Sequence, residues 1–88
     1  MKRNDQFIKH TIGGKDVIVA VGAASKTFNG MIAVNATGAF IWDHLEKETT
    51  MEELVAAMVG HYDVDVATAE QNAATFIKTL REVGAVVG

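Results

Sequence analysis

The chain contains no cysteine and no proline, and it has one tryptophan and one tyrosine among its 88 residues. Without cysteine it can form no disulfide framework, zinc ribbon or iron–sulfur cluster, and it offers no thiol nucleophile. Charged residues make up only 22% and the formal net charge is −3, which argues against a general nucleic-acid or anionic-membrane surface.

The sequence also lacks a secretory signal and any apolar run long enough to span a bilayer. Together these absences predict a cytoplasmic protein with no membrane partner, no nucleic-acid partner, and no metal or other cofactor.

The chain does have a hydrophobic fraction of 49%, which is enough for one modest core at this length. Its size fits a single domain spanning residues 1–88, with little room for a deep substrate cavity. We expect residues 1–6, which are mostly charged and polar, to form a flexible tail.

Three short strands are predicted before residue 35. Residues 7–12 alternate between two faces, with the period of a half-buried strand. Residues 17–21 are apolar on both faces and rich in β-branched side chains, as in a strand with a neighbour on each edge. Gly13-Gly14 and Asn29-Gly30 mark turns, and residues 31–34 form the third strand. Short connections favour an antiparallel meander.

Three helices are predicted after the strands. Asn35 can cap the first, and Thr50 with Glu53 makes a capping box for the second. Asp65 can cap a third helix of about 18 residues by its apolar period. Gly60 and Gly84 are placed to end the second and third helices.

Apolar residues at helical spacing predict the core. The residues assigned to it outright are Phe40, Trp42, Leu54, Phe76 and Leu80. The stripe of the third helix adds Val66, Ala69, Ala73, Ile77 and Val83. An order of three strands and then three helices gives an α+β fold in which the helices pack on one face of the sheet.

Few residues are candidates for catalysis. His44 and His61 each lie near carboxylates, and such a pair could act as a general base or bind a metal. Their predicted positions are helix ends and loops, where acidic residues cap helices and face solvent, and their spacing matches no ligand set. Ser25 lies in no nucleophile motif. The sequence therefore predicts a protein that is not an enzyme.

Two kinds of binding surface remain open. The last helix could enter DNA as in a winged-helix regulator, but its outward face has Lys78 and Arg81 balanced by Glu70 and Glu82, a poor phosphate track. The third strand has neither lysine nor proline to block pairing, so its edge could accept a guest strand. That edge could equally be covered by a neighbouring element, or by a second copy in a small homo-oligomerising domain.

The stretch from Phe28 to Trp42 has a strand ending in Val34-Asn35, then Thr37-Gly38-Ala39 and Ile41-Trp42. It resembles the signature of the PqqD-like family, relatives of coenzyme PQQ synthesis protein D that are also called RiPP recognition elements (RiPPs are ribosomally made, modified peptides). The resemblance runs from about Val17 to the C-terminus and continues through Thr50–Val55, Tyr62–Val64 and Phe76–Gly84. Asn72 stands where many members carry aspartate.

The resemblance implies a winged-helix-like fold and a non-catalytic role. Family members bind the leader of a precursor peptide by strand addition and present the precursor to a modifying enzyme, often a radical SAM protein, as in PQQ biosynthesis. We therefore expect a peptide-binding chaperone, as a monomer or weak homodimer, whose pathway need not be PQQ synthesis. Carried over to this chain, the pairing edge consists of Gly30, Met31, Ile32, Ala33 and Val34.

The last helix offers two candidate walls for a groove beside that edge. Glu70, Ala74, Ile77 and Arg81 border one side of its core stripe, and Thr68, Asn72, Thr75 and Thr79 border the other. Because a leader needs pockets for apolar side chains, we predict that Ala74 and Ile77 line the groove. Lys78 and Arg81 would then attract acidic leader residues at its rim. The alternative for Ile77 is plain core packing.

Overall fold

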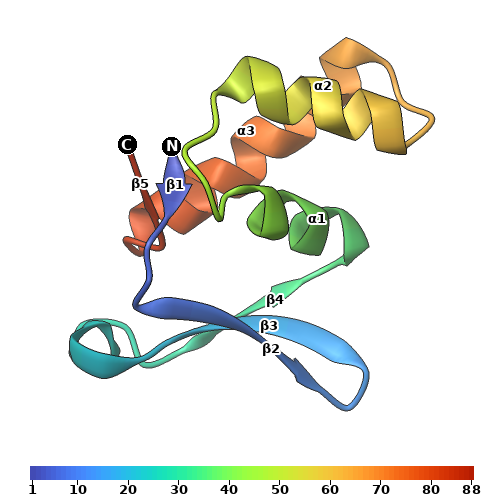
Figure 1. Cartoon of the computed structure of the whole chain (residues 1–88). Coiled ribbons are helices and arrows are strands. Elements are labelled where there is room, and N and C mark those ends of the chain that lie inside the picture. Colours follow the sequence, from blue (N-terminus) through green and yellow to red (C-terminus); the bar gives the residue numbers. More distant parts are fainter.

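A computed structural model describes residues 1–88 as an α+β domain, in which a three-stranded antiparallel sheet is followed by three helices (Figure 1). This winged-helix-like arrangement is the predicted one. The elements are β1 (Lys2–Arg3), β2 (Phe7–Ile12), β3 (Lys15–Ala20), β4 (Met31–Val34), α1 (Ala36–His44), α2 (Met51–His61), α3 (Val66–Glu82) and β5 (Val86–Val87), with a short 3-10 helix at Gly22–Lys26.

The main sheet has the order β2-β3-β4, with both pairs antiparallel. The strand that is apolar on both faces is the central one, as predicted. Gly13 and Gly14 close the β2–β3 hairpin with φ angles of 59° and 79°, which side chains disfavour. Because β2 and β4 each pair on one side only, both outer edges of the sheet are unpaired.

Each helix begins at the residue that the sequence indicated. The side chains of Asn35, Thr50 and Asp65 accept hydrogen bonds from the amides of Gly38, Glu53 and Thr68. These caps fix where the chain changes direction, and so they fix how the helices lie over the sheet. The ends differ slightly from expectation: α2 continues past Gly60 to His61, and α3 has 17 residues.

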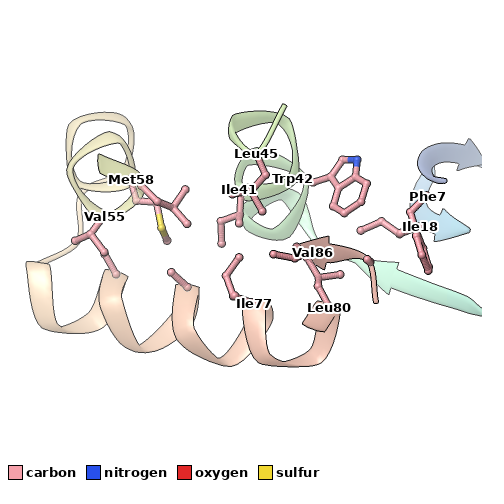
Figure 2. Close-up of a cluster of buried hydrophobic side chains, with 14 residues drawn as sticks. Phe7, Ile18, Ile41, Trp42, Leu45, Val55, Met58, Ile77, Leu80 and Val86 are labelled. Atoms are coloured by element: carbon pink, nitrogen blue, oxygen red, sulfur yellow. The ribbon is translucent and has the colours of Figure 1, made fainter. Parts of the chain in front are cut away.

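The core lies between the helices and one face of the sheet. Trp42 of α1 points towards Phe7 and Ile18 of the sheet, while Ile77 and Leu80 of α3 lie opposite Ile41 and Leu45 (Figure 2). One core prediction was wrong: Val66, at the first position of α3, is 57% exposed. Phe40, Phe76 and Val83 are half-buried and pack against the core. No helix is both long enough and apolar enough to span a membrane.

The two chain ends lie side by side (Figure 1). Residues 1–6 were expected to form a flexible tail, but Lys2–Arg3 pair with Val86–Val87 in a second, two-stranded sheet. The amide of Arg3 also donates to the Leu45 carbonyl at 2.9 Å, and that of Asn4 to the Ala85 carbonyl at 2.8 Å. Main-chain hydrogen bonds hold this segment, and a polar side-chain composition gives no sign of them.

Candidate functional site

A groove of about 460 Å³ lies where β4, the start of α1 and α3 meet. Strand β4 contributes Ile32 and Ala33. The α1 region contributes Asn35, Thr37, Gly38 and Ile41. Helix α3 contributes Gln71, Asn72, Thr75, Phe76 and Thr79. The groove therefore runs beside the unpaired edge of β4, where a guest strand would find backbone hydrogen-bonding groups.

Gly38 allows α1 to approach the floor of this groove closely. A Cβ added there would lie 3.3 Å from ring carbons of Phe76 and 3.3 Å from the Cβ of Val34. Glycine inside a helix lowers helix stability by about 1 kcal/mol relative to alanine, so a packing contact is the usual reason for it. The close approach lets the half-buried Phe76 ring form part of the floor.

The groove is polar along α3 and contains no charged residue. Asn35 and Thr79 make hydrogen bonds within the chain. The side chains of Gln71, Asn72 and Thr75 make none, so their amide and hydroxyl groups can bond a ligand. An apolar floor with uncharged donors and acceptors along one wall suits an extended peptide, and the lining has no basic side chain to pair with a phosphate.

The structure separates the predicted site residues into two groups. Gly30 immediately precedes β4, and Met31, Ile32, Ala33 and Val34 form it, so the predicted pairing edge is one continuous segment. Of these five, Ile32 and Ala33 line the groove.

The four residues predicted on α3 do not line the groove. Ile77 is 1% exposed and packs in the core. Ala74 and Lys78 are exposed outside the groove, and the Arg81 guanidinium donates to the Gly88 carbonyl at 2.8 Å. Rotation of α3 about its axis places Ile77 inwards, so the opposite border of the helix faces β4.

The residues that sequence reasoning missed lie on that opposite border. They are Asn72, Thr75 and Thr79, on the border that an apolar criterion disfavours, together with Gln71 and with Phe76, which the sequence predicts as core. A run of amide and hydroxyl side chains with no charge was the available signal, since an ordinary solvent-facing stripe would carry lysine and glutamate.

The other sheet edge, on β2, is less suited to a guest strand. The Lys9 ammonium forms an ion pair with the Asp43 carboxylate of α1 at 2.8 Å, and a lysine on an edge strand discourages pairing. The pocket beside this strand is smaller, about 280 Å³, and charged, since Arg3, Lys9 and Asp43 line it.

The two histidines considered for catalysis lie around one aromatic ring. The His61 ring stacks on Phe40 with centroids 4.6 Å apart, and the His44 ring lies 4.3 Å from Phe40 on α1. Nowhere does the fold gather three or more His, Asp or Glu side chains that could hold a metal ion.

A family model described as coenzyme PQQ synthesis protein D (PqqD) matches residues 17–86, which is most of the chain. This chain belongs to the PqqD family. The matched range of this PqqD-family chain includes β4, α1 and α3, and so it includes the whole groove.

One solved structure is similar to this PqqD-family chain along its full length. It is TbiB1 in complex with the TbiA(beta) leader peptide, with a TM-score of 0.78 and 26% sequence identity. The similarity covers 100% of this chain and 96% of that chain. A search of curated proteins finds no match.

Proposed function

We propose that this protein is a peptide-binding RiPP recognition element, which captures the leader of a ribosomal precursor peptide as an added strand on β4. The observation that carries the proposal is the unpaired β4 edge beside an uncharged groove, in a PqqD-family chain. The similarity to TbiB1, whose structure holds a leader peptide, supports the same assignment.

The physical basis is strand addition with side-chain selection. Main-chain hydrogen bonds to the β4 edge would supply affinity for an extended peptide of almost any sequence. Alternate side chains of the peptide would then point over Ile32, Gly38 and Phe76, where an apolar residue is favoured. The amides of Gln71 and Asn72 would bond the polar groups of the same peptide along α3.

The lining also predicts which leaders are rejected. A charged side chain placed in this groove would lose its hydration without gaining an ionic partner, because no groove residue carries a charge. We therefore expect the bound leader segment to be uncharged and its affinity to change little with salt. This replaces the sequence-based expectation that Lys78 and Arg81 attract acidic leader residues.

The protein itself would not be catalytic. Its role would be to present the rest of the precursor to a modifying enzyme, of the radical SAM class in the family's usual pattern. The cysteine ligands that such chemistry needs are absent from this chain and would belong to that enzyme.

A matched pair of substitutions tests this assignment. Thr75→Arg places a long charged side chain in the groove, whereas Ala74→Arg makes the same change one position along α3, on exposed surface. Binding is measured by fluorescence anisotropy with labelled peptides from short precursor-like reading frames encoded beside the gene. We expect Thr75→Arg to weaken binding by about tenfold or more and Ala74→Arg by less than about twofold.

Several outcomes would contradict the assignment. Equal effects of the two substitutions would place the peptide elsewhere on α3. Absence of binding by the wild-type protein to any neighbouring short peptide would remove the proposed function. A salt-dependent shift with duplex DNA in its place would favour a winged-helix regulator.

A further inference from the structure

The face of the main sheet that points away from the helices has no covering element. Figure 1 shows the three helices on one side of β2, β3 and β4. Strand register identifies the side chains on the other side, because directly paired residues of an antiparallel sheet share a face. The outward residues are Ile8, His10 and Ile12 of β2, Lys15, Val17 and Val19 of β3, and Met31 and Ala33 of β4.

This outer sheet face is unusually apolar for a surface in water. A sheet with one covered face normally alternates apolar and polar residues, with the polar ones outside. Here six of the eight outward residues are apolar, and they include Ile8 at 43%, Ile12 at 51% and Met31 at 65% exposure. They form adjacent cross-strand rows, Ile8 beside Val19 beside Met31, rather than scattered single residues. Contiguous apolar surface of this kind marks an interaction site.

The charges on this face indicate what kind of surface covers it. Its polar members are Lys15 and His10, and it carries no carboxylate, although the chain as a whole has a net charge of −3. Asp16 faces the other side, where it accepts a hydrogen bond from the Thr11 hydroxyl at 2.6 Å. A second copy packed face to face would offer Lys15 no carboxylate, because the same face carries none. The complementary surface is therefore that of a different protein, apolar and with a carboxylate opposite Lys15.

The outer sheet face is also continuous with the proposed peptide edge. Met31 and Ala33 belong to β4, and Ala33 borders the groove as well. A leader added to β4 would place every second side chain beside these two residues, which widens the same face by one strand. A protein seated on the face would touch the chaperone and its bound leader together.

We propose that the modifying enzyme docks on the outer sheet face, with apolar side chains over Ile8, Ile12 and Met31 and a carboxylate paired with Lys15. This inference rests on the proposed function, since the enzyme is the partner that must recognise the loaded protein. It assigns enzyme docking to the sheet and leader capture to the β4–α3 groove, so the two surfaces meet only at β4.

The test uses the full chain and a purified candidate modifying enzyme encoded in the same gene neighbourhood, immobilised on a sensor. Ile8→Thr combined with Ile12→Thr makes β2 polar while keeping good strand formers, and Lys15→Glu reverses the charge. All three positions lie on strands other than β4. Val66→Thr is the matched control, because Val66 is at least as exposed as Ile8 and Ile12, at 57%, but belongs to α3. Circular dichroism verifies that each variant folds, and anisotropy measures its leader affinity separately.

We expect the double variant and Lys15→Glu each to bind the enzyme about tenfold more weakly, with leader affinity unchanged. Val66→Thr should bind the enzyme as the wild type does. Unchanged binding by the sheet variants, or a loss confined to Val66→Thr, would overturn the inference. So would failure of the wild type to bind any such enzyme, or a wild-type dimer that the double variant converts to a monomer. Loss of leader binding by the wild type would instead contradict the proposed function.

Discussion

Two consecutive side chains of α3, Phe76 and Ile77, have different surroundings. Ile77 is 1% exposed and packs against the core, whereas Phe76 is half-buried and forms part of the groove floor. Successive residues of a helix point about 100° apart, so a small rotation of the helix decides which of the two faces the sheet edge. Apolar character alone does not distinguish a core residue from a groove residue.

Truncation of Ile77 tests its assignment to the core. We expect Ile77→Ala to lower the free energy of unfolding by about 2–5 kcal/mol, because it removes buried methyl groups and leaves a cavity. Urea denaturation followed by circular dichroism measures this change. Lys78→Ala, at the exposed neighbouring position, should change stability by less than about 0.5 kcal/mol.

The folded Ile77→Ala protein should still bind the leader with wild-type affinity. This affinity is measured without denaturant, at a temperature well below the unfolding midpoint of the variant. A protein of unchanged stability that lost leader binding would return Ile77 to the groove wall.

At the scale of elements, the capping box at the start of α2 makes the stability of the helix depend on pH. The Thr50 amide donates to the Glu53 carboxylate at 3.1 Å, and this bond, with a smaller contribution from the Thr50 side chain, lowers the pKa of Glu53 below its ordinary value of 4.5. Asp65 at the start of α3 has its pKa lowered in the same way by Thr68, from 3.8. Each of the two longer helices thus has a hydrogen-bonded carboxylate at its N-cap or in its first turn.

Because the pKa of Glu53 is lower in the folded protein than in the unfolded chain, its stabilising effect is complete above the unfolded value and is lost as pH falls through the folded one. We expect the unfolding midpoint of the wild type to fall as pH drops below about 4.5. Glu53→Gln should reduce this dependence on pH. Thermal unfolding at a series of pH values from neutral to strongly acidic measures the effect.

Glu52→Gln is the control for that experiment, because Glu52 lies in the same first turn but is not part of the capping box. Its pH dependence should match the wild type's. If both glutamine variants behaved alike, the capping box would not be the source of the acid sensitivity.

At the scale of the whole molecule, the first residues join elements far apart in the sequence. The Arg3 guanidinium donates to the Trp42 carbonyl at 3.2 Å and lies 5.6 Å from the centroid of the Trp42 ring. Beside it, β1 pairs with β5 at the other end of the chain. Residues 1–3 therefore connect α1 to the segment that follows α3.

Substitution of Arg3 tests this connection. We expect Arg3→Ala to lower the free energy of unfolding by about 1–2 kcal/mol, through loss of the hydrogen bond and the cation–π contact. Lys2→Ala, which changes an exposed neighbour on the same strand, should have little effect. Chemical denaturation of both variants measures the difference, and equal effects would mean that only the charge of the segment matters.

The sequence by itself determined the three strands of the main sheet, the three helices and their order. Helix caps at Asn35, Thr50 and Asp65, the Gly13-Gly14 turn and the central apolar strand depend on neighbours within a few residues, and the structure confirms them. The predicted tight turn at Asn29-Gly30 is instead part of a longer loop that follows the 3-10 helix. The resemblance of residues 28–42 also identified the family correctly. The fold class could be predicted because it rests on local periodicity and short connections, whereas the pattern alone did not decide whether the third-strand edge is open or covered.

Tertiary structure alone decided which face of α3 lines the groove, which face of the sheet is left uncovered, and that the first residues are held in a strand. Each depends on how rigid elements rotate and pack against one another over long separations in sequence. For that reason Asn72 and Thr75, rather than Ala74 and Ile77, lie beside β4. Hydrogen bonds between the two chain ends hold the first residues in place, and the composition of residues 1–6 gives no sign of this.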